Sequence, residues 1–289
     1  MSTFKKIAVM GAGALGGYFG GRAAAAGGNV SFVARGAHLQ ALQEKGLEVE
    51  SPMGDFHLQK ITATDNPGDI GPVDLILFLV KLFDTEAAAR QMAPMVGADT
   101  TILSFQNGID PWDTLKGIYG NEKVLGGIAT ISANIKAPGV ISHSSTFANI
   151  IFGEFNGEIS KRVKGIEKCL AVPGQTATAV SDIGVKIWEK FIFLTAFSGL
   201  TALTRLPIGK VLEDPKTNKL FTGALEEVIA LGRENCPGLP GDVMEKTLSF
   251  VQNLPYEFRS SLLNDLTRGK KLEIDQLSGT VARLGKAAG

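Results

Sequence analysis

Short apolar runs and amphipathic stretches alternate along the first half of the chain. Residues 74–80 (DLILFLV) form a continuous apolar run, which is typical of a strand that is covered on both faces. The pattern predicts strands at residues 5–10, 29–34, 74–80 and 100–105 and helices at residues 14–26, 38–45 and 85–95. Such alternation favours a parallel, doubly wound sheet of the α/β class.

The pattern of apolar positions changes between residues 123 and 180. Pro-Gly and Asn-Gly turns interrupt it, and it predicts one helix at residues 159–170 and strands at residues 124–133, 140–143, 150–152 and 176–180. We expect these strands to form a mixed or antiparallel extension of the same sheet.

Strand signals fade after residue 182, and helical periodicity replaces them. The predicted helices span residues 183–205, 218–235, 242–253, 260–268 and 272–286. We therefore predict a domain boundary near residues 181 and 182. An α/β domain would occupy residues 1–181, and an all-α domain would occupy residues 182–289.

Composition and charge narrow the classes of partner. Hydrophobic residues make up 44% of the chain, which is enough for a large core, and 29 basic residues balance 29 acidic ones. This balance favours neither a nucleic-acid partner nor an anionic membrane surface. The cysteines and histidines show no metal-ligand spacing, so we expect no metal site.

The longest strongly apolar stretch, residues 191–203, is shorter than the about 20 residues that a membrane-spanning helix needs. The first residues, MSTFKKIAVMGAG, lack the layout of a signal peptide. We therefore expect a soluble, cytoplasmic protein with no membrane partner. The apolar helix is able to pack internally or against a second copy of the chain, so a homodimer stays open as an alternative.

A glycine-rich loop with the spacing GxGxxG joins the first predicted strand to the first predicted helix. Its residues are Gly11, Ala12, Gly13, Ala14, Leu15 and Gly16. In such a loop Gly11 permits a tight turn, Gly13 lets a pyrophosphate approach the backbone, and Gly16 lets the helix pack closely on the sheet. Free N–H groups and the positive end of the helix dipole favour the phosphates of a dinucleotide. The alternative is a glycine-rich turn that binds nothing.

The end of the second predicted strand indicates which dinucleotide is bound. Sites that prefer NAD usually carry Asp or Glu there to hold the ribose 2′-hydroxyl. Here the segment is NVSFVARGAHL, with no carboxylate before Glu44, and Arg35 stands at the expected position. A guanidinium suits a 2′-phosphate through charge-assisted hydrogen bonds, so we favour NADP(H) as the cofactor. A solvated surface arginine is the alternative.

Two further polar residues follow apolar strands. Lys81 comes directly after residues 74–80, and Asn107 follows residues 100–105. Ligands of open α/β sheets bind beyond the carboxyl ends of the strands, so both residues are candidates for contact with a cofactor or substrate. Asn-Gly is also a common turn dipeptide, so a purely structural role for Asn107 stays open.

In the predicted helical domain, Lys190 enters a strongly apolar helix within the segment WEKFIF. Its side chain either extends to solvent from the end of the helix or is partly desolvated for a purpose. Desolvation lowers the pKa of a lysine, which suits proton transfer near neutral pH. Glu273, in the segment KLEID, would by itself be interpreted as a charge on a helix surface.

Together, the ordered motifs GAGALG, VKLFDT, FQNGI, WEK before a long apolar helix, SSLLNDL and LEID resemble those of the ketopantoate reductases, or 2-dehydropantoate 2-reductases. Their order and spacing match over nearly the whole chain. The resemblance implies a Rossmann-type domain that binds NADP(H), followed by an all-helical domain that binds the substrate. It also implies that NADPH reduces a small 2-oxo acid, 2-dehydropantoate, to (R)-pantoate for pantothenate and coenzyme A synthesis.

For the cofactor, the resemblance implies that residues 11–16 bind the pyrophosphate and that Arg35 binds the 2′-phosphate. Lys81 and Asn107 would line the cofactor cleft, with Asn107 also near the substrate.

For the chemistry, the resemblance implies that Lys190 is the catalytic lysine, which donates a proton to the carbonyl oxygen. Glu273 would engage the substrate hydroxyl and help to orient Lys190, and Ser261 would help to bind the substrate.

Two positions depart from the family pattern, which usually has asparagines four and eight residues after the catalytic lysine, on one face of the helix. Here these positions are Leu194 and Ser198. Leu194 cannot hydrogen-bond a substrate, and Ser198 is shorter than asparagine. Either the enzyme prefers a different, more apolar 2-oxo acid or ketone, or it binds 2-dehydropantoate in a rearranged pocket that includes Ser198.

An alternative hypothesis assigns the chain to another class of protein, a regulator that senses NADPH without turning it over. Such a sensor has no need of a proton donor, so the pair of Lys190 and Glu273 favours an enzyme.

Overall fold

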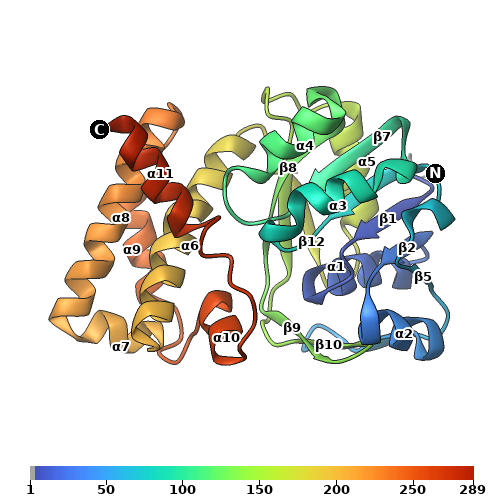
Figure 1. The fold of residues 1–289 in the computed structure, drawn as a ribbon, viewed down its shortest axis with the longest axis horizontal. Coiled ribbons are helices and arrows are strands. Elements are labelled where there is room, and N and C mark those ends of the chain that lie inside the picture. The colour runs from blue at the N-terminus through green and yellow to red at the C-terminus, as the bar shows by residue number, and fades with distance from the viewer. Residues whose placement is uncertain (1–3) are drawn as a thin grey trace. The chain divides into compact units, whose positions relative to one another are not determined.

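A computed structural model of the chain describes residues 4–289. By their contacts these residues divide into two units (Figure 1). The N-terminal unit runs up to Gln106 and includes Asp110–Ile183, and the C-terminal unit comprises Asn107–Ile109 and Gly184–Gly289. Residues 1–3, which begin the segment tested for a signal peptide, lie outside the described residues. Within residues 4–289, no helix is both long enough and apolar enough to cross a membrane.

The main sheet of the N-terminal unit has eight strands in the order β12-β11-β8-β7-β6-β1-β2-β5. Neighbouring strands are parallel except for β11 and β8, which are antiparallel, so the sheet is mixed. The strands are β1 (Ile7–Met10), β2 (Val30–Val33), β5 (Thr62–Thr64), β6 (Val73–Phe78), β7 (Val96–Ser104), β8 (Val124–Thr130), β11 (Asn149–Gly153) and β12 (Thr176–Ala179).

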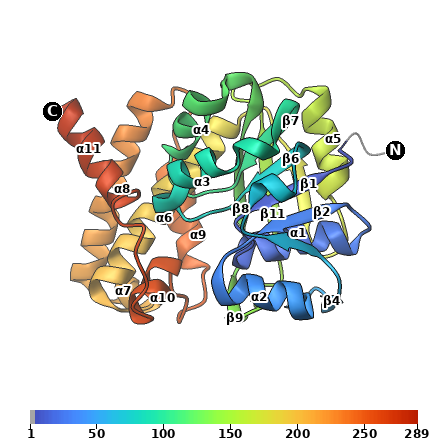
Figure 2. The same cartoon turned by 45° about the vertical axis from the view of Figure 1, so that its right-hand side comes forward.

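The centre of the main sheet is covered on both faces, and β1 is buried along its whole length. Helices α3 and α4 contact each other, and so do α1 and α5, as expected for two layers of helices around a doubly wound sheet (Figure 2). The helices of this unit are α1 (Ala14–Ala25), α2 (Gly36–Lys45), α3 (Thr85–Gln91), α4 (Pro111–Tyr119) and α5 (Lys161–Leu170).

A second sheet, in the order β4-β3-β10-β9, departs from the prediction of one continuous sheet. Its strands are β3 (Leu47–Glu50), β4 (Phe56–Leu58), β9 (Ala133–Ala137) and β10 (Val140–His143). The chain leaves the main sheet after β8 and forms the β9–β10 hairpin, which pairs with β3. This sheet packs closely on α1, because a Cβ added to Gly17 would lie 2.9 Å from Ile141 Cγ1.

The described part of the C-terminal unit is helical, which confirms the predicted fold class of a Rossmann-type doubly wound sheet followed by an all-α domain. Its helices are α6 (Ile183–Thr204), α7 (Ile208–Glu213), α8 (Pro215–Asn235), α9 (Val243–Gln252), α10 (Ser261–Thr267) and α11 (Ser278–Ala288) (Figure 1). The short α7 was not predicted, and α11 begins at Ser278 rather than at residue 272.

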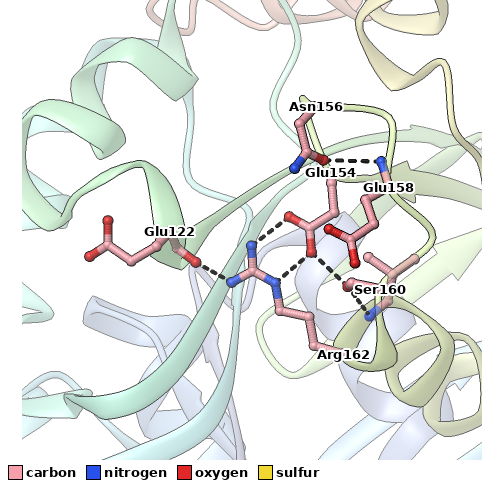
Figure 3. Close-up of polar contacts among 7 residues, drawn as sticks. Glu122, Glu154, Asn156, Glu158, Ser160 and Arg162 are labelled. Atoms are coloured by element: carbon pink, nitrogen blue, oxygen red, sulfur yellow. Dashed lines mark hydrogen bonds and ion pairs between the residues drawn. The ribbon is translucent and has the colours of Figure 1, made fainter.

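An ion-pair network joins the end of β11 to the start of α5 (Figure 3). Arg162 donates to both oxygens of Glu154, at 2.7 Å and 2.5 Å, and also to the carbonyl of Glu122. Ser160 donates to the same carboxylate at 2.7 Å and caps α5. Burial opposes the charge on Glu154, but the hydrogen bonds from Arg162 and Ser160 outweigh it and lower its pKa. The network therefore fixes the position of α5 against the sheet.

Candidate functional site

The glycine-rich loop turns sharply where β1 ends. Gly11 has a φ of +98°, a conformation that favours glycine. The N–H groups of Gly11 and Ala12 both donate to Val33 O, at 3.2 Å and 2.9 Å. Gly13 is the N-cap of α1 and offers no capping side chain, and a Cβ added to it would meet no atom within 4 Å. The first turn of α1 is therefore accessible to an anion, which its N–H groups and dipole would favour.

Gly16 lies where α1 closely approaches both the loop and β1. A Cβ added to Gly16 would lie 2.2 Å from Gly11 O and 2.8 Å from Val9 Cγ1. We therefore expect Gly16→Ala to lower the free energy of unfolding by about 1–3 kcal/mol, because the helix must shift away from the strand. Urea unfolding of the purified variant measures this change.

Gly117→Ala is the matched control, since Gly117 lies within α4 and an added Cβ there meets no atom within 4 Å. This variant is expected to be neutral or slightly stabilising, because alanine favours helix more than glycine does. Equal stability of the Gly16→Ala variant and the wild type would contradict the close approach of α1 to the loop.

Arg35 follows β2, which is the neighbour of β1 in the sheet, and it is the N-cap residue of α2. Its guanidinium donates to Asp84 Oδ2 at 2.8 Å, and 73% of its side chain is exposed. An exposed ion pair of this kind contributes only about 0–1 kcal/mol. An anionic ligand is therefore able to displace Asp84 and use the same guanidinium.

The strands β7, β6 and β1 are neighbours, so their carboxyl ends lie at one edge of the sheet. Lys81 is exposed in the segment that follows β6. The buried Gln106 joins this segment to the end of β7, because its Nε2 donates to Val80 O at 3.0 Å and to Thr85 Oγ1 at 2.8 Å. The motif FQNGI contains Gln106 but does not reveal this role, since the contacts depend on the pairing of two strands.

The residues predicted to bind substrate belong to the C-terminal unit. They are Asn107, Lys190, Ser198, Ser261 and Glu273. Asn107 follows β7 in the chain but is grouped with the helical unit together with Gly108 and Ile109.

Lys190 and Glu273 interact electrostatically within the C-terminal unit. Lys190 is partly exposed on α6, whereas Glu273 is buried, with 7% of its surface exposed. Burial lowers the pKa of Lys190 to about 8, and the negative charge of Glu273 opposes this shift. A lysine with this pKa is largely protonated at neutral pH and gives up its proton more readily than an ordinary lysine.

The interpretation of Glu273 as a charge on a helix surface is wrong. The residue lies in the turn before α11, where the Leu277 N–H donates to Glu273 O at 3.1 Å. The residue is buried, and the spacing of KLEID along the chain could not reveal this burial.

The predicted serines differ in their surroundings. Ser198 is 1% exposed and donates to Leu194 O at 2.5 Å, so its hydroxyl proton is used within α6. Ser261 is exposed at the start of α10. Its neighbour Ser260 is buried, caps α10 and makes a 2.8 Å hydrogen bond to the Thr201 hydroxyl.

A recess in the N-terminal unit, with a volume of about 770 Å³, contains none of the predicted residues. Its lining residues are Lys116, Asn121, Glu122, Val124, Glu154, Phe155, Asn156, Glu158 and Arg162. Val124 begins β8, and Glu154 follows β11, which is antiparallel to β8. The recess therefore lies at the amino-terminal edge of the parallel strands, opposite to the glycine-rich loop, and we assign it no part in the site.

The chain matches two family models. The model described as "Ketopantoate reductase PanE/ApbA" matches residues 7–157. The model described as "Ketopantoate reductase PanE/ApbA C terminal" matches residues 182–289.

Individual relatives are similar to this chain over nearly its whole length. The chain is 32% identical to the 2-dehydropantoate 2-reductase of Archaeoglobus fulgidus, over 99% of this chain and 92% of that protein. The crystal structure of 2-dehydropantoate 2-reductase from Geobacter metallireducens GS-15 superposes with a TM-score of 0.90 at 31% identity, over 98% and 94% of the two chains. A D-mandelate dehydrogenase solved with NADH and anilino(oxo)acetate shares the fold, with a TM-score of 0.88 at 19% identity over 98% and 92% of the chains.

Proposed function

Because the chain belongs to the ketopantoate reductase family of oxidoreductases, we propose that it reduces 2-dehydropantoate to (R)-pantoate with NADPH, and that Lys190 donates the proton. The observation that carries this proposal is the pair of Lys190 and Glu273, with the pKa of the lysine lowered to about 8. Residues 1–181 would bind the dinucleotide, and residues 182–289 would bind the substrate and carry the catalytic lysine.

The residues of the N-terminal unit fit a dinucleotide that carries a 2′-phosphate. Gly13 leaves open space beside the first turn of α1, which suits the pyrophosphate. Arg35 offers an exposed guanidinium at the end of the neighbouring strand, where a 2′-phosphate would replace Asp84 as its partner. These two features support the assignment of NADP(H), with Lys81 and Asn107 as further residues of the cofactor cleft.

Lys190 and Glu273 have complementary tasks in the proposed reaction. The dinucleotide, when bound, supplies a hydride to the ketone carbon, and negative charge builds on the ketone oxygen. The Lys190 ammonium stabilises that charge and then transfers a proton to the oxygen, which completes the alcohol. Glu273 favours the protonated lysine through its negative charge, and its carboxylate is the candidate acceptor for a substrate hydroxyl.

The pH dependence of kcat tests this assignment. Only protonated Lys190 can act as the acid, so we expect kcat for ketone reduction to fall as the pH rises through about 8. Glu273→Gln removes the negative charge that raises the pKa of Lys190, so the falling limb should move to lower pH. Steady-state kinetics at saturating substrate over this pH range measure both effects.

Glu189→Gln is the control, because Glu189 lies on the same helix but accepts its hydrogen bond from Lys186, at 2.9 Å. This control should leave the falling limb in place. A falling limb that does not move in the Glu273→Gln variant would contradict the coupling between the two groups.

A more apolar 2-oxo acid is a second candidate substrate. Leu194 lies one helical turn beyond Lys190, on the same face of α6, and the hydroxyl proton of Ser198 is already donated to Leu194 O. This face therefore offers fewer free donors than an asparagine pair would, and it favours a substrate with an apolar group at that point.

A substrate panel separates the candidates. NADPH oxidation is followed with 2-dehydropantoate and with 2-oxo acids that carry larger apolar groups, and each reaction is repeated with NADH. Turnover of 2-dehydropantoate with the highest kcat/KM supports the proposal, whereas a higher kcat/KM for an apolar acid supports the second candidate. Tight binding of NADPH without turnover of any acid would instead favour a regulator.

A further inference from the structure

His38 connects the glycine-rich loop to a distant hairpin. Its Nε2 lies 2.9 Å from Ala12 O, in the middle of the loop. Its Nδ1 lies 3.1 Å from the backbone N of Gly139, in the turn between β9 and β10. Figures 1 and 2 show α2, which carries His38, beside this hairpin.

These contacts determine the tautomer of the ring. The Gly139 N–H can only donate, so Nδ1 accepts and carries no proton. The neutral imidazole then carries its proton on Nε2, which donates to Ala12 O. Burial lowers the pKa of His38, with the Ala12 hydrogen bond acting in the opposite direction, and this agrees with a neutral ring.

The carbonyl that accepts this hydrogen bond belongs to the peptide unit between Ala12 and Gly13. That peptide is trans, so its C=O and N–H groups point in opposite directions. Because the C=O points toward His38, the Gly13 N–H points away from it. The preceding peptide is held separately, since the Ala12 N–H donates to Val33 O at 2.9 Å.

The hairpin gives His38 a rigid support. Gly139 has a φ of +79°, and its carbonyl accepts a hydrogen bond from the Glu48 N–H at 2.9 Å. A Cβ added to Gly139 would lie 3.1 Å from Ala41 Cβ, so the turn also packs closely on α2. The imidazole is thus held at one nitrogen by the small sheet while its other nitrogen holds the loop.

We propose that His38 is a positioning residue of the dinucleotide site, which orients the Gly13 N–H toward the pyrophosphate by holding the Ala12 carbonyl. This inference rests on the proposed function, because it takes the glycine-rich loop as the binding site of NADPH. It assigns the binding role to one contact of the ring, at Nε2, and a structural role to the other, at Nδ1.

Two amide substitutions separate these contacts. In His38→Gln the amide nitrogen reaches the position of Nε2 and is able to donate to Ala12 O. In His38→Asn the shorter amide reaches only the position of Nδ1, where its oxygen is able to accept from the Gly139 N–H. We expect the Kd for NADPH to stay within about twofold of the wild type in His38→Gln and to rise about 5- to 10-fold in His38→Asn.

Titration of each purified protein with NADPH, followed by the fluorescence of the reduced nicotinamide, measures Kd. Steady-state kinetics on the full chain should show a raised KM for NADPH in His38→Asn with an unchanged kcat, because His38 does not touch the reacting atoms. Thermal unfolding without NADPH measures separately how much the hydrogen bond between His38 Nδ1 and the Gly139 N–H stabilises the fold. His57→Asn is the matched control, since His57 lies on β4 of the same small sheet and contacts Lys45 O at 2.8 Å.

The outcomes distinguish the inference from the proposed function. Rescue of NADPH binding by asparagine instead of glutamine would show that only the hairpin contact matters and would overturn the inference. Equal affinity in both variants and the wild type would overturn it as well, while the proposed function would stand. Failure of the wild type itself to bind NADPH would remove the proposed function.

Discussion

Replacing Lys190 by alanine is expected to lower kcat for ketone reduction by about 10²–10⁴-fold, which is the usual contribution of a positioned general acid. The substitution removes both the cation that stabilises charge on the substrate oxygen and the source of the proton. It should leave the Kd for NADPH nearly unchanged, because the proposed pyrophosphate and 2′-phosphate contacts come from the N-terminal unit. Steady-state kinetics and a separate NADPH titration measure the two quantities.

Lys186→Ala is the matched control for this experiment. Lys186 lies one helical turn earlier on α6, and its ammonium donates to Glu189 Oε2 at 2.9 Å. Loss of this partly exposed pair should change kcat little. If the Lys190→Ala and Lys186→Ala variants keep the same kcat, Lys190 has no part in the proton transfer.

The second large effect is expected for Arg35→Asp, on the choice of dinucleotide. The variant removes the charge-assisted hydrogen bonds to a 2′-phosphate and puts a carboxylate in their place. We expect the Kd for NADPH to rise about 10- to 100-fold, with a much smaller change for NADH. Parallel titrations with the two reduced dinucleotides measure the ratio.

Asp84→Asn is the companion of this variant, since Asp84 forms an ion pair with the Arg35 guanidinium at 2.8 Å. Removing this exposed partner frees the cation, so NADPH should bind as tightly as in the wild type or a few-fold more tightly. An unchanged preference between NADPH and NADH in the Arg35→Asp variant would show that Arg35 does not read the 2′-phosphate.

Local sequence patterns were sufficient for most of the architecture. The apolar runs predicted the core strands β1, β2, β6 and β7, and helical periodicity predicted α1 and α6 within a few residues of their observed bounds. The GxGxxG spacing between a strand and a helix indicated a turn at Gly11 and close packing at Gly16, and both are present in the structure. These features are local because each depends on residues that are close together in the sequence.

Local patterns failed where short elements pair over long distances. The strands β3 and β4 have only three or four residues each; they pair with each other, and β3 also pairs with β10, which is far away in the sequence. The helix α4 was also missed. It begins at Pro111 after the Asn-Gly pair, where the sequence pattern indicates a turn.

For the candidate site, the residue types could be predicted from the sequence: a glycine-rich loop, an arginine after the second strand, and a lysine entering an apolar helix. The contacts among them could not be predicted: Glu273 is buried and interacts electrostatically with Lys190, Asp84 pairs with Arg35, and His38 holds the loop carbonyl. Charge, burial and hydrogen bonding depend on which distant segments meet. Periodicity reports only how each segment folds along its own length.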